Sequence, residues 1–326
     1  MSLMGLLLSS VVITACQPSD QNKEKNKENV DQVSVSEPVV ETLRLIGSTQ
    51  RIPIQMEPCR GNGCPEITID RLATNQPVLD KIIDQAILKQ IQSTMDVDET
   101  LEGQNKKSQE LNQSTASSAS ENVVKMTAVE SLASEVRPYV NNFFKINEDL
   151  KKMGVNHQIT FSVSPKILNS QAPLATVVLN SSHYLGGAHG SSAQQYFNFD
   201  LESQKLISLN QVIQTQKQNQ FKQLAYDAFK TWVIDNKLAE DVQEYEQAWK
   251  FSLSQNFYLG QQGIILQYQE YEIGPYVVGL PRLTIPYEQL KDILKPEYLP
   301  EAFKTQLVNT EAVSASESKV IEVKKS

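Results

Sequence analysis

The chain has 326 residues, of which 40% are hydrophobic and 21% are charged, and its formal net charge at pH 7 is -8. This length is enough for one domain of ordinary size or for two small ones. An acidic surface repels phosphate backbones and no Lys- and Arg-rich run is interleaved with aromatic residues, so nucleic acid is excluded as an expected partner, whereas a basic protein is electrostatically allowed.

The first 15 residues are predicted to be a lipoprotein signal peptide. Residues 3–15 form an apolar run that is too short to span a bilayer as a permanent helix, and the run ends in the sequence ITAC at residues 13–16. This ending resembles the lipobox of bacterial lipoproteins, in which two small residues precede the cysteine that receives diacylglycerol. We therefore expect cleavage before Cys16 and a lipid anchor on its thiol. In a bacterium with two membranes, Gln17 in place of Asp indicates the outer membrane, with the protein facing the periplasm.

Residues 16–40, which begin with the lipidated cysteine, are predicted to be a flexible tether, because they are too polar to bury enough apolar surface to offset chain entropy. Residues 41–95 are predicted to form an N-terminal subdomain. Apolar and polar residues alternate in two strand-like segments, 42–46 and 51–56, and apolar residues recur at helical spacing over residues 77–94. The pattern predicts an α/β-type subdomain in which one amphipathic helix packs on the strands.

Cys59 and Cys64 are the two cysteines that remain once Cys16 is acylated. They flank a four-residue loop with two glycines, which supply the backbone freedom that a short disulfide turn needs. Export to an oxidising compartment also favours a disulfide. A metal site needs more ligands than two thiols, and a redox-active pair usually has the tighter C-x-x-C spacing. We therefore expect a disulfide here, and neither a metal nor a cofactor.

A second polar stretch, residues 96–121, is rich in Ser, Gln, Asn and Glu and is predicted to be a flexible linker, and the tail at residues 309–326 is predicted to be disordered. Residues 122–308 are predicted to form the larger domain. Its first part, residues 122–152, has a helical pattern interrupted by Pro138. A proline inside a helix removes a hydrogen bond, so the sequence predicts either a kinked helix or two shorter helices.

The apolar pattern then changes from helical spacing to alternation. The alternating segments, predicted as strands, are 159–163, 176–180, 197–201, 257–259 and 265–269. A helical region, residues 216–251, lies between the third and the fourth of them. Strands followed by a helix and then by further strands, with short connections, predict an α+β fold in which a mainly antiparallel sheet packs against helices.

Two groups of motifs resemble a known family. Residues 184–190 read YLGGAHG and residues 196–200 read YFNFD, and later residues 263–268 read GIILQY, residues 271–276 read YEIGPY and residues 283–287 read LTIPY. These motifs are similar to those of the RsiV-like periplasmic domain family, a domain of unknown function. The likeness extends from about residue 157 to residue 294, and residues 65–91 resemble the smaller domain that often precedes it.

The resemblance implies an extracytoplasmic binding domain. Such domains occur on lysozyme-sensing anti-sigma factors, where they bind lysozyme, and beside the deacetylase domain of cell-wall enzymes. We expect neither a cytoplasmic anti-sigma part nor a deacetylase domain in this chain. The expected function is therefore non-catalytic binding of a lysozyme-like basic protein or of peptidoglycan at the envelope. The candidate ligand-binding residues are Tyr184, Gly186, Gly187, His189, Gly190, Glu272 and Tyr276.

The alternative is a cell-wall hydrolase or deacetylase-type enzyme that uses His183 and His189 as metal ligands or as a general base. Their spacing is not the helical i,i+4 pair of zinc hydrolases, which argues against a metal site. Glu270 and Glu272, two apart on a predicted strand, would point to the same side, although a solvated strand face is the favoured explanation for them. No Gly-x-Ser-x-Gly motif accompanies Ser191, so a turn-capping role is the simpler one.

Overall fold

The structure is a computed structural model that describes residues 43–56, 58–61, 63–95 and 126–304. The expected signal peptide, tether, linker and C-terminal tail lie outside these residues, and so does Cys16. None of the described helices is long and apolar enough to cross a membrane.

A six-stranded sheet dominates the first part of the chain. Its strands are β1 (Gly47–Arg51), β2 (Glu66–Thr74), β3 (Thr160–Asn169), β4 (Ala175–Tyr184), β5 (Ser191–Asp200) and β6 (Lys205–Leu206), paired in that order. The pair β2–β3 is parallel, and every other pair in this sheet is antiparallel. The predicted α+β fold with a mainly antiparallel sheet is therefore confirmed.

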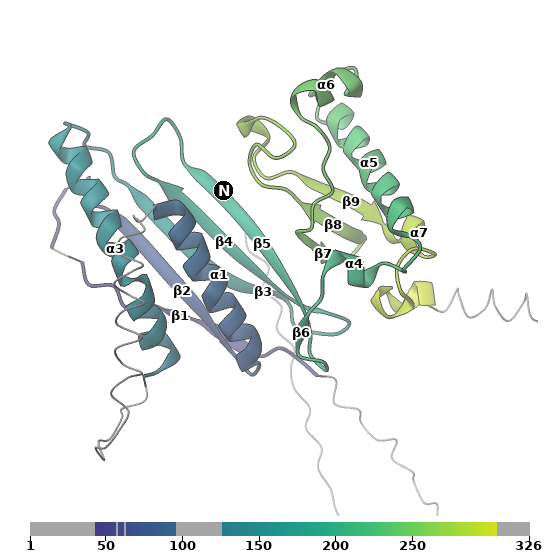
Figure 1. Ribbon diagram of the computed structural model, residues 1–326, viewed down its shortest axis with the longest axis horizontal. Helices are drawn as coiled ribbons and strands as arrows, with labels where there is room; N and C mark the ends of the chain where they lie inside the picture. The colour runs from purple at the N-terminus through teal and green to yellow at the C-terminus, as the bar shows by residue number, and fades with distance from the viewer. Residues whose placement is uncertain (1–42, 57, 62, 96–125, 305–326) are drawn as a thin grey trace, which may run out of the picture. The chain divides into compact units, whose positions relative to one another are not determined.

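Two helices, α1 (Pro77–Met95) and α3 (Ala128–Lys152), cover one face of this sheet (Figure 1). Every fourth residue of α1 is buried with at most 1% of its surface exposed: Leu79, Ile83, Ile87, Ile91 and Met95. This spacing places all five on one side of the helix, which contacts β2, β3 and β4. The helix predicted over residues 77–94 is therefore confirmed.

The first hydrophobic core does not follow the predicted division of the chain. It combines buried residues between Leu45 and Met95 with buried residues between Leu132 and Leu201. The reason is the pairing of β2 with β3, which places residues from both sides of the expected linker in one sheet. The segment 41–95 therefore contributes to a shared core and does not form a subdomain with a core of its own.

The second core belongs to a smaller sheet and its helices. The strands are β7 (Phe257–Leu259), β8 (Gly263–Gln267) and β9 (Arg282–Pro286), all antiparallel, and the helices are α4 (Leu209–Val212), α5 (Gln218–Asp235), α6 (Val242–Ala248), α7 (Tyr287–Leu290) and the short 3₁₀ helix η2 (Pro296–Tyr298). Helix α5 contacts β9, and its buried residues Phe221, Ala225, Phe229 and Val233 again recur every fourth position. The predicted helical region 216–251 is therefore two helices.

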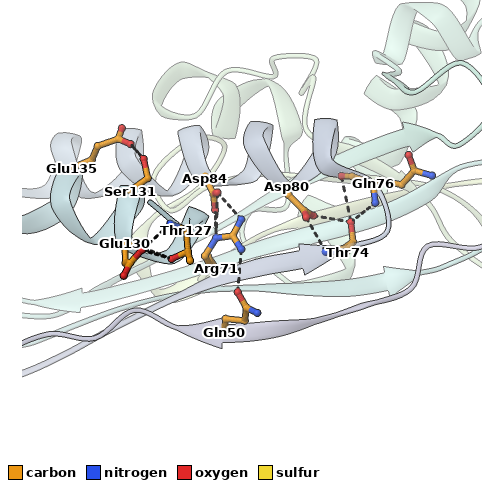
Figure 2. A network of polar contacts seen from close by, with 10 residues as sticks. All are labelled: Gln50, Arg71, Thr74, Gln76, Asp80, Asp84, Thr127, Glu130, Ser131 and Glu135. Carbon is orange, nitrogen blue, oxygen red and sulfur yellow. Dashed lines mark hydrogen bonds and ion pairs between the residues drawn. The ribbon is translucent and has the colours of Figure 1, made fainter. Parts of the chain in front are cut away.

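A polar network holds α1 against the first sheet (Figure 2). The Arg71 guanidinium, on β2 and 4% exposed, donates to both carboxylate oxygens of Asp84 at 2.8 to 3.3 Å and to the Gln50 side-chain oxygen at 3.1 Å. The Asp80 carboxylate accepts from the backbone N–H of Thr74 at 2.8 Å and from its hydroxyl at 2.7 Å. Burial raises the pKa of Asp84, against the lowering effect of Arg71.

Candidate binding site

The loop between β4 and β5 meets the segment after β8 around His189. The His189 Nδ1 lies 2.9 Å from the Gly190 carbonyl oxygen, and its Nε2 lies 3.1 Å from the Tyr271 hydroxyl. Because a carbonyl oxygen can only accept, Nδ1 carries the proton and Nε2 accepts from Tyr271. Both ring nitrogens of His189 are therefore hydrogen-bonded within the protein.

Four aromatic side chains gather here, and we call His189, Trp249, Tyr271 and Tyr276 the aromatic cluster. The His189 and Tyr276 rings stack with centroids 3.9 Å apart, and the Tyr271 centroid lies 5.8 Å from that of Tyr276 and 6.5 Å from that of Trp249. The Tyr276 hydroxyl donates to the Gly190 carbonyl oxygen at 3.0 Å. Each such ring pair stabilises its contact by about 0.5–1.5 kcal/mol. The aromatic cluster thus holds the loop between β4 and β5 against the segment after β8.

Tyr271 is the unusual member of the aromatic cluster. Its φ is 63°, a left-handed conformation that residues other than glycine adopt rarely. Half of its surface is exposed, although an aromatic ring of this size is usually covered. The backbone at this position is therefore held in a strained conformation that keeps a large ring in contact with solvent.

Glu270 joins the same segment to the exposed edge of β5. Its carboxylate accepts from the Ser191 hydroxyl at 2.8 Å and from the Ser192 backbone N–H at 2.9 Å. Next to it, Gln269 donates through its side-chain amide to the Gln194 carbonyl oxygen at 2.9 Å, while its own side-chain oxygen is buried without a hydrogen-bond partner. A groove of about 430 Å³ runs between these residues. The unpartnered Gln269 oxygen is covered by protein atoms, so it does not face this groove as an open acceptor.

The expectation that Glu270 and Glu272 share one side of a strand is wrong. Strand β8 ends at Gln267, and the chain turns through the left-handed Tyr271 directly afterwards. The Glu272 carboxylate accepts from the Gln269 backbone N–H at 2.9 Å, so it closes this turn. The two carboxylates therefore have different partners and do not form a catalytic pair.

His183 and His189 have different neighbours in the structure. His183 lies on β4, half-buried and opposite Ser191 in the strand register. Burial lowers its pKa, and the nearby Glu270 charge raises it by a smaller amount. Its neighbours are thus different from the ring partners of His189. Among the described residues, no group of three or more His, Cys, Asp or Glu side chains could hold a metal ion.

The remaining candidates shape the turn at the end of β4. Gly186 has a φ of 86°, and a Cβ there would lie 2.9 Å from the Leu150 Cδ1. At Gly190 a Cβ would lie 2.9 Å from the His183 carbonyl oxygen. Gly187 has open space where a side chain would be, and Tyr184 is a half-buried residue at the end of β4. Gly186 and Gly190 are thus required by the backbone itself, which explains both without a ligand.

Two members of the aromatic cluster, Trp249 and Tyr271, were not among the candidates from the sequence. Trp249 follows α6, in a region that the sequence analysis predicted as helical without assigning this residue a role. Tyr271 stands within a motif that the family resemblance highlights, so its place in that motif is the one signal that could have identified it.

Cys59 and Cys64 form a disulfide in the structure, with their Cα atoms 5.7 Å apart. Gly61, between them, has a φ of 105°, which is the backbone freedom that the sequence analysis expected of the loop. The pair lies in the loop between β1 and β2, two paired strands of the first sheet. Its oxidation in the cell stays a prediction.

Residues 199–288 match the profile of a family described as "Protein of unknown function (DUF3298)". The chain therefore contains a DUF3298-family domain. The match extends from the end of β5 to the beginning of α7, so it includes Trp249, Tyr271 and Tyr276 but not His189. The narrower likeness to the lysozyme-sensing members stays an expectation.

A curated relative is the peptidoglycan-N-acetylmuramic acid deacetylase PdaC of Bacillus subtilis (strain 168), 24% identical over 170 residues. The similar region is 50% of this chain and 35% of that enzyme, so the chain spans about a third of the length of the curated relative that it matches. The deacetylase activity in that enzyme's name belongs to the full-length enzyme and is not assigned to this chain.

Two crystal structures of DUF3298 family members are similar to this chain. One, from Pseudomonas aeruginosa PAO1, is 23% identical, covers 79% of this chain and 96% of its own, and superposes with a TM-score of 0.52. The other, from Bacteroides fragilis, is 16% identical, covers 78% and 93%, and has a TM-score of 0.46. The first similarity shows a shared fold and nothing further.

Proposed function

We propose that this protein is an envelope-anchored lipoprotein whose described part binds peptidoglycan through the aromatic cluster and catalyses no reaction. The observation that carries the proposal is the Tyr271 ring, half exposed on a strained backbone against His189 and Trp249. Strain of this kind costs about 1–3 kcal/mol and persists where the surroundings enforce it, often at ligand-binding positions.

The chemistry of the aromatic cluster suits a sugar polymer. An exposed tyrosine ring offers an apolar face to the C–H surface of a sugar, and its rigid side chain loses little entropy on binding. The similarity to an enzyme whose name places its substrate in peptidoglycan supports the same ligand class.

The alternative of a hydrolase or deacetylase-type enzyme at His183 and His189 has less support. Both ring nitrogens of His189 are engaged, and His183 has a separate environment on β4. The two imidazole rings have no hydrogen-bond partner in common among the described residues, so they are not paired as this alternative requires.

The test is cosedimentation of the full chain with purified peptidoglycan, comparing Tyr271→Gly with Tyr271→Phe. Glycine removes the ring and also the backbone strain, so this variant keeps its fold, and we expect about tenfold weaker binding. Phenylalanine keeps the ring and loses only the hydroxyl, so it should bind nearly as well as the natural chain. Equal binding by all three proteins would contradict the proposal.

A second arm of the same experiment offers a basic lysozyme in place of peptidoglycan. The net charge of -8 allows such a partner. Binding to lysozyme that depends on Tyr271, with no binding to peptidoglycan, would replace the proposed ligand by a protein.

The lipid anchor has its own test. Cells that express the natural chain should incorporate labelled palmitate into it and retain it in the membrane fraction. The Cys16→Ser variant should lose the label, because oxygen in place of sulfur removes the thiol that is acylated. A variant that keeps both the label and the membrane fractionation would overturn the proposed anchor, whatever the result with peptidoglycan.

A further inference from the structure

A second groove lies on the outer face of the smaller sheet. In the strand register Tyr258 pairs with Ile265, and Ile265 pairs with Thr284, so these three side chains lie in a row across β7, β8 and β9. Their neighbours Leu283 and Ile285 point the other way and are buried in the second core. One face of the sheet thus serves the core, and the opposite face forms the floor of the groove.

The groove has a volume of about 770 Å³, within the range of about 300–1,000 Å³ that small-molecule sites occupy. One wall comes from the end of the β3–β4 hairpin, with Leu168 and Pro173. The other comes from η2 and the residues after it, with Tyr298 and Leu299. On the floor, the Tyr258 ring stacks on Tyr196 at 4.4 Å and 19°, which fixes its orientation.

No charged side chain is among the fourteen residues that line this groove, although 21% of the chain is charged. A charged ligand would lose its hydration here without gaining an opposite charge. The lining therefore favours a ligand without net charge.

The lining is nevertheless not purely apolar. The Thr284 hydroxyl, the Gln262 side-chain amide and the Tyr298 hydroxyl have no hydrogen-bond partner within residues 43–56, 58–61, 63–95 and 126–304. An acyl chain would cover these groups and leave them unpaired, at a cost of about 1–3 kcal/mol for each group that it buries. The ligand must therefore carry its own donors and acceptors.

We propose that this groove binds a short, uncharged, N-acetylated oligosaccharide. The apolar faces of the sugar rings would lie on Tyr258 and Tyr298, and their hydroxyl and acetamido groups would exchange hydrogen bonds with Thr284 and Gln262. The groove shares no residue with the aromatic cluster, so this inference does not depend on the function proposed above.

The probe is N,N′,N″-triacetylchitotriose, titrated into the full chain by calorimetry. We expect saturable binding that is about tenfold weaker or more for Tyr298→Ala, and several-fold weaker for Thr284→Val. Thr284 is exposed on a strand, where valine is well tolerated, so this second variant keeps the test valid if Tyr298→Ala is poorly folded. The fully deacetylated, cationic chitotriose should bind more weakly than the acetylated form.

The control is Lys222→Ala, at an exposed residue of α5 that lines neither the groove nor the aromatic cluster, and it should leave the titration unchanged. Tyr271→Gly removes only binding at the aromatic cluster, so the part of the titration that depends on Tyr298 and Thr284 should persist in it. Absence of saturable binding to the natural chain would overturn the inference. So would a result in which the Tyr298 and Thr284 variants bind the sugar as tightly as the natural chain does. Loss of binding in Tyr271→Gly alone would also overturn it, because the sugar would then occupy the aromatic cluster and support the proposed function instead. A fatty acid or a proline-rich peptide that displaced the sugar as the tighter ligand would assign the groove to a different class.

Discussion

A chain that begins at residue 122, where the sequence pattern places the start of the larger domain, is expected not to form the first sheet. Such a chain lacks β1, β2 and α1, so β3 becomes an edge strand and the sheet loses one of the two helices that cover it. We expect no protected backbone amides across β3 and β4 in hydrogen exchange. A chain that begins at residue 42 is the matched control and should show the same protection as the full protein.

The free energy gained by burying the apolar side chains of α1 is the reason for this expectation. The five buried residues of α1 that recur every fourth position each stabilise the fold by about 1.5–3 kcal/mol through burial, or about 7–15 kcal/mol together. That is as large as the whole net stability of a typical domain, about 5–15 kcal/mol. Protected amides throughout β3 and β4 in the chain from residue 122 would show instead that the larger domain is independent.

The sequence predicted α1 well because its signal is local. An apolar residue at every fourth position fixes both the helix and its buried face without reference to any other part of the chain. The predicted boundary between subdomains was less successful, because the pairing of β2 with β3 crosses about ninety residues and no local pattern records it.

Pro138 shows how packing overrides a local signal. Of the two expectations, that of two shorter helices is wrong, because α3 continues through the proline from Ala128 to Lys152. Leu132 and Val136 before the proline, and Phe143 after it, are buried in the same core. The burial of residues on both sides compensates for the loss of about 3 kcal/mol that an interior proline causes.

The first strand illustrates a different limit. Alternation at residues 42–46 and 51–56 predicted two strands, whereas β1 is Gly47–Arg51, between them, and is exposed throughout. Its position follows from pairing with β2, in which Gly47 lies opposite Thr74. An edge strand whose side chains are all exposed has no apolar alternation, so the sequence offers no signal for it.

The candidate site was predicted in part. His189 and Tyr276 were named from the family motifs, and the structure stacks their rings. Trp249 and Tyr271 complete the aromatic cluster from parts of the chain that are about sixty to eighty residues away from His189. Their proximity depends on the tertiary structure, which periodicity and turn signals do not describe.

Substitution of Arg71 by methionine is expected to lower the free energy of unfolding by about 3–5 kcal/mol, because it leaves the Asp84 carboxylate without its buried partner. The side chains of Arg71 and Asp84 are 5% and 18% exposed, so water cannot replace the lost contact fully. Urea unfolding of the natural chain and of Arg71→Met measures the difference.

The neighbouring pair of Arg51 with Asp70 is the matched control. The Arg51 side chain is 63% exposed, and exposed pairs contribute only about 0–1 kcal/mol. Arg51→Met should therefore have little effect. The double variant Arg71→Met with Asp84→Leu should regain most of the lost stability, because it removes the unpaired charge along with its partner.

The pH dependence distinguishes an unpaired charge from lost packing. Burial already raises the pKa of Asp84, and removing Arg71 removes the largest effect that lowers it, so this pKa rises further in Arg71→Met. A carboxyl whose pKa is higher in the folded than in the unfolded state makes the fold more stable as pH falls through the folded-state pKa. The deficit of Arg71→Met should therefore shrink between pH 7 and about pH 4, near the unfolded-state pKa of Asp. A deficit that stays constant over this range would mean that the loss comes from packing, and that the Asp84 charge is not what Arg71 stabilises.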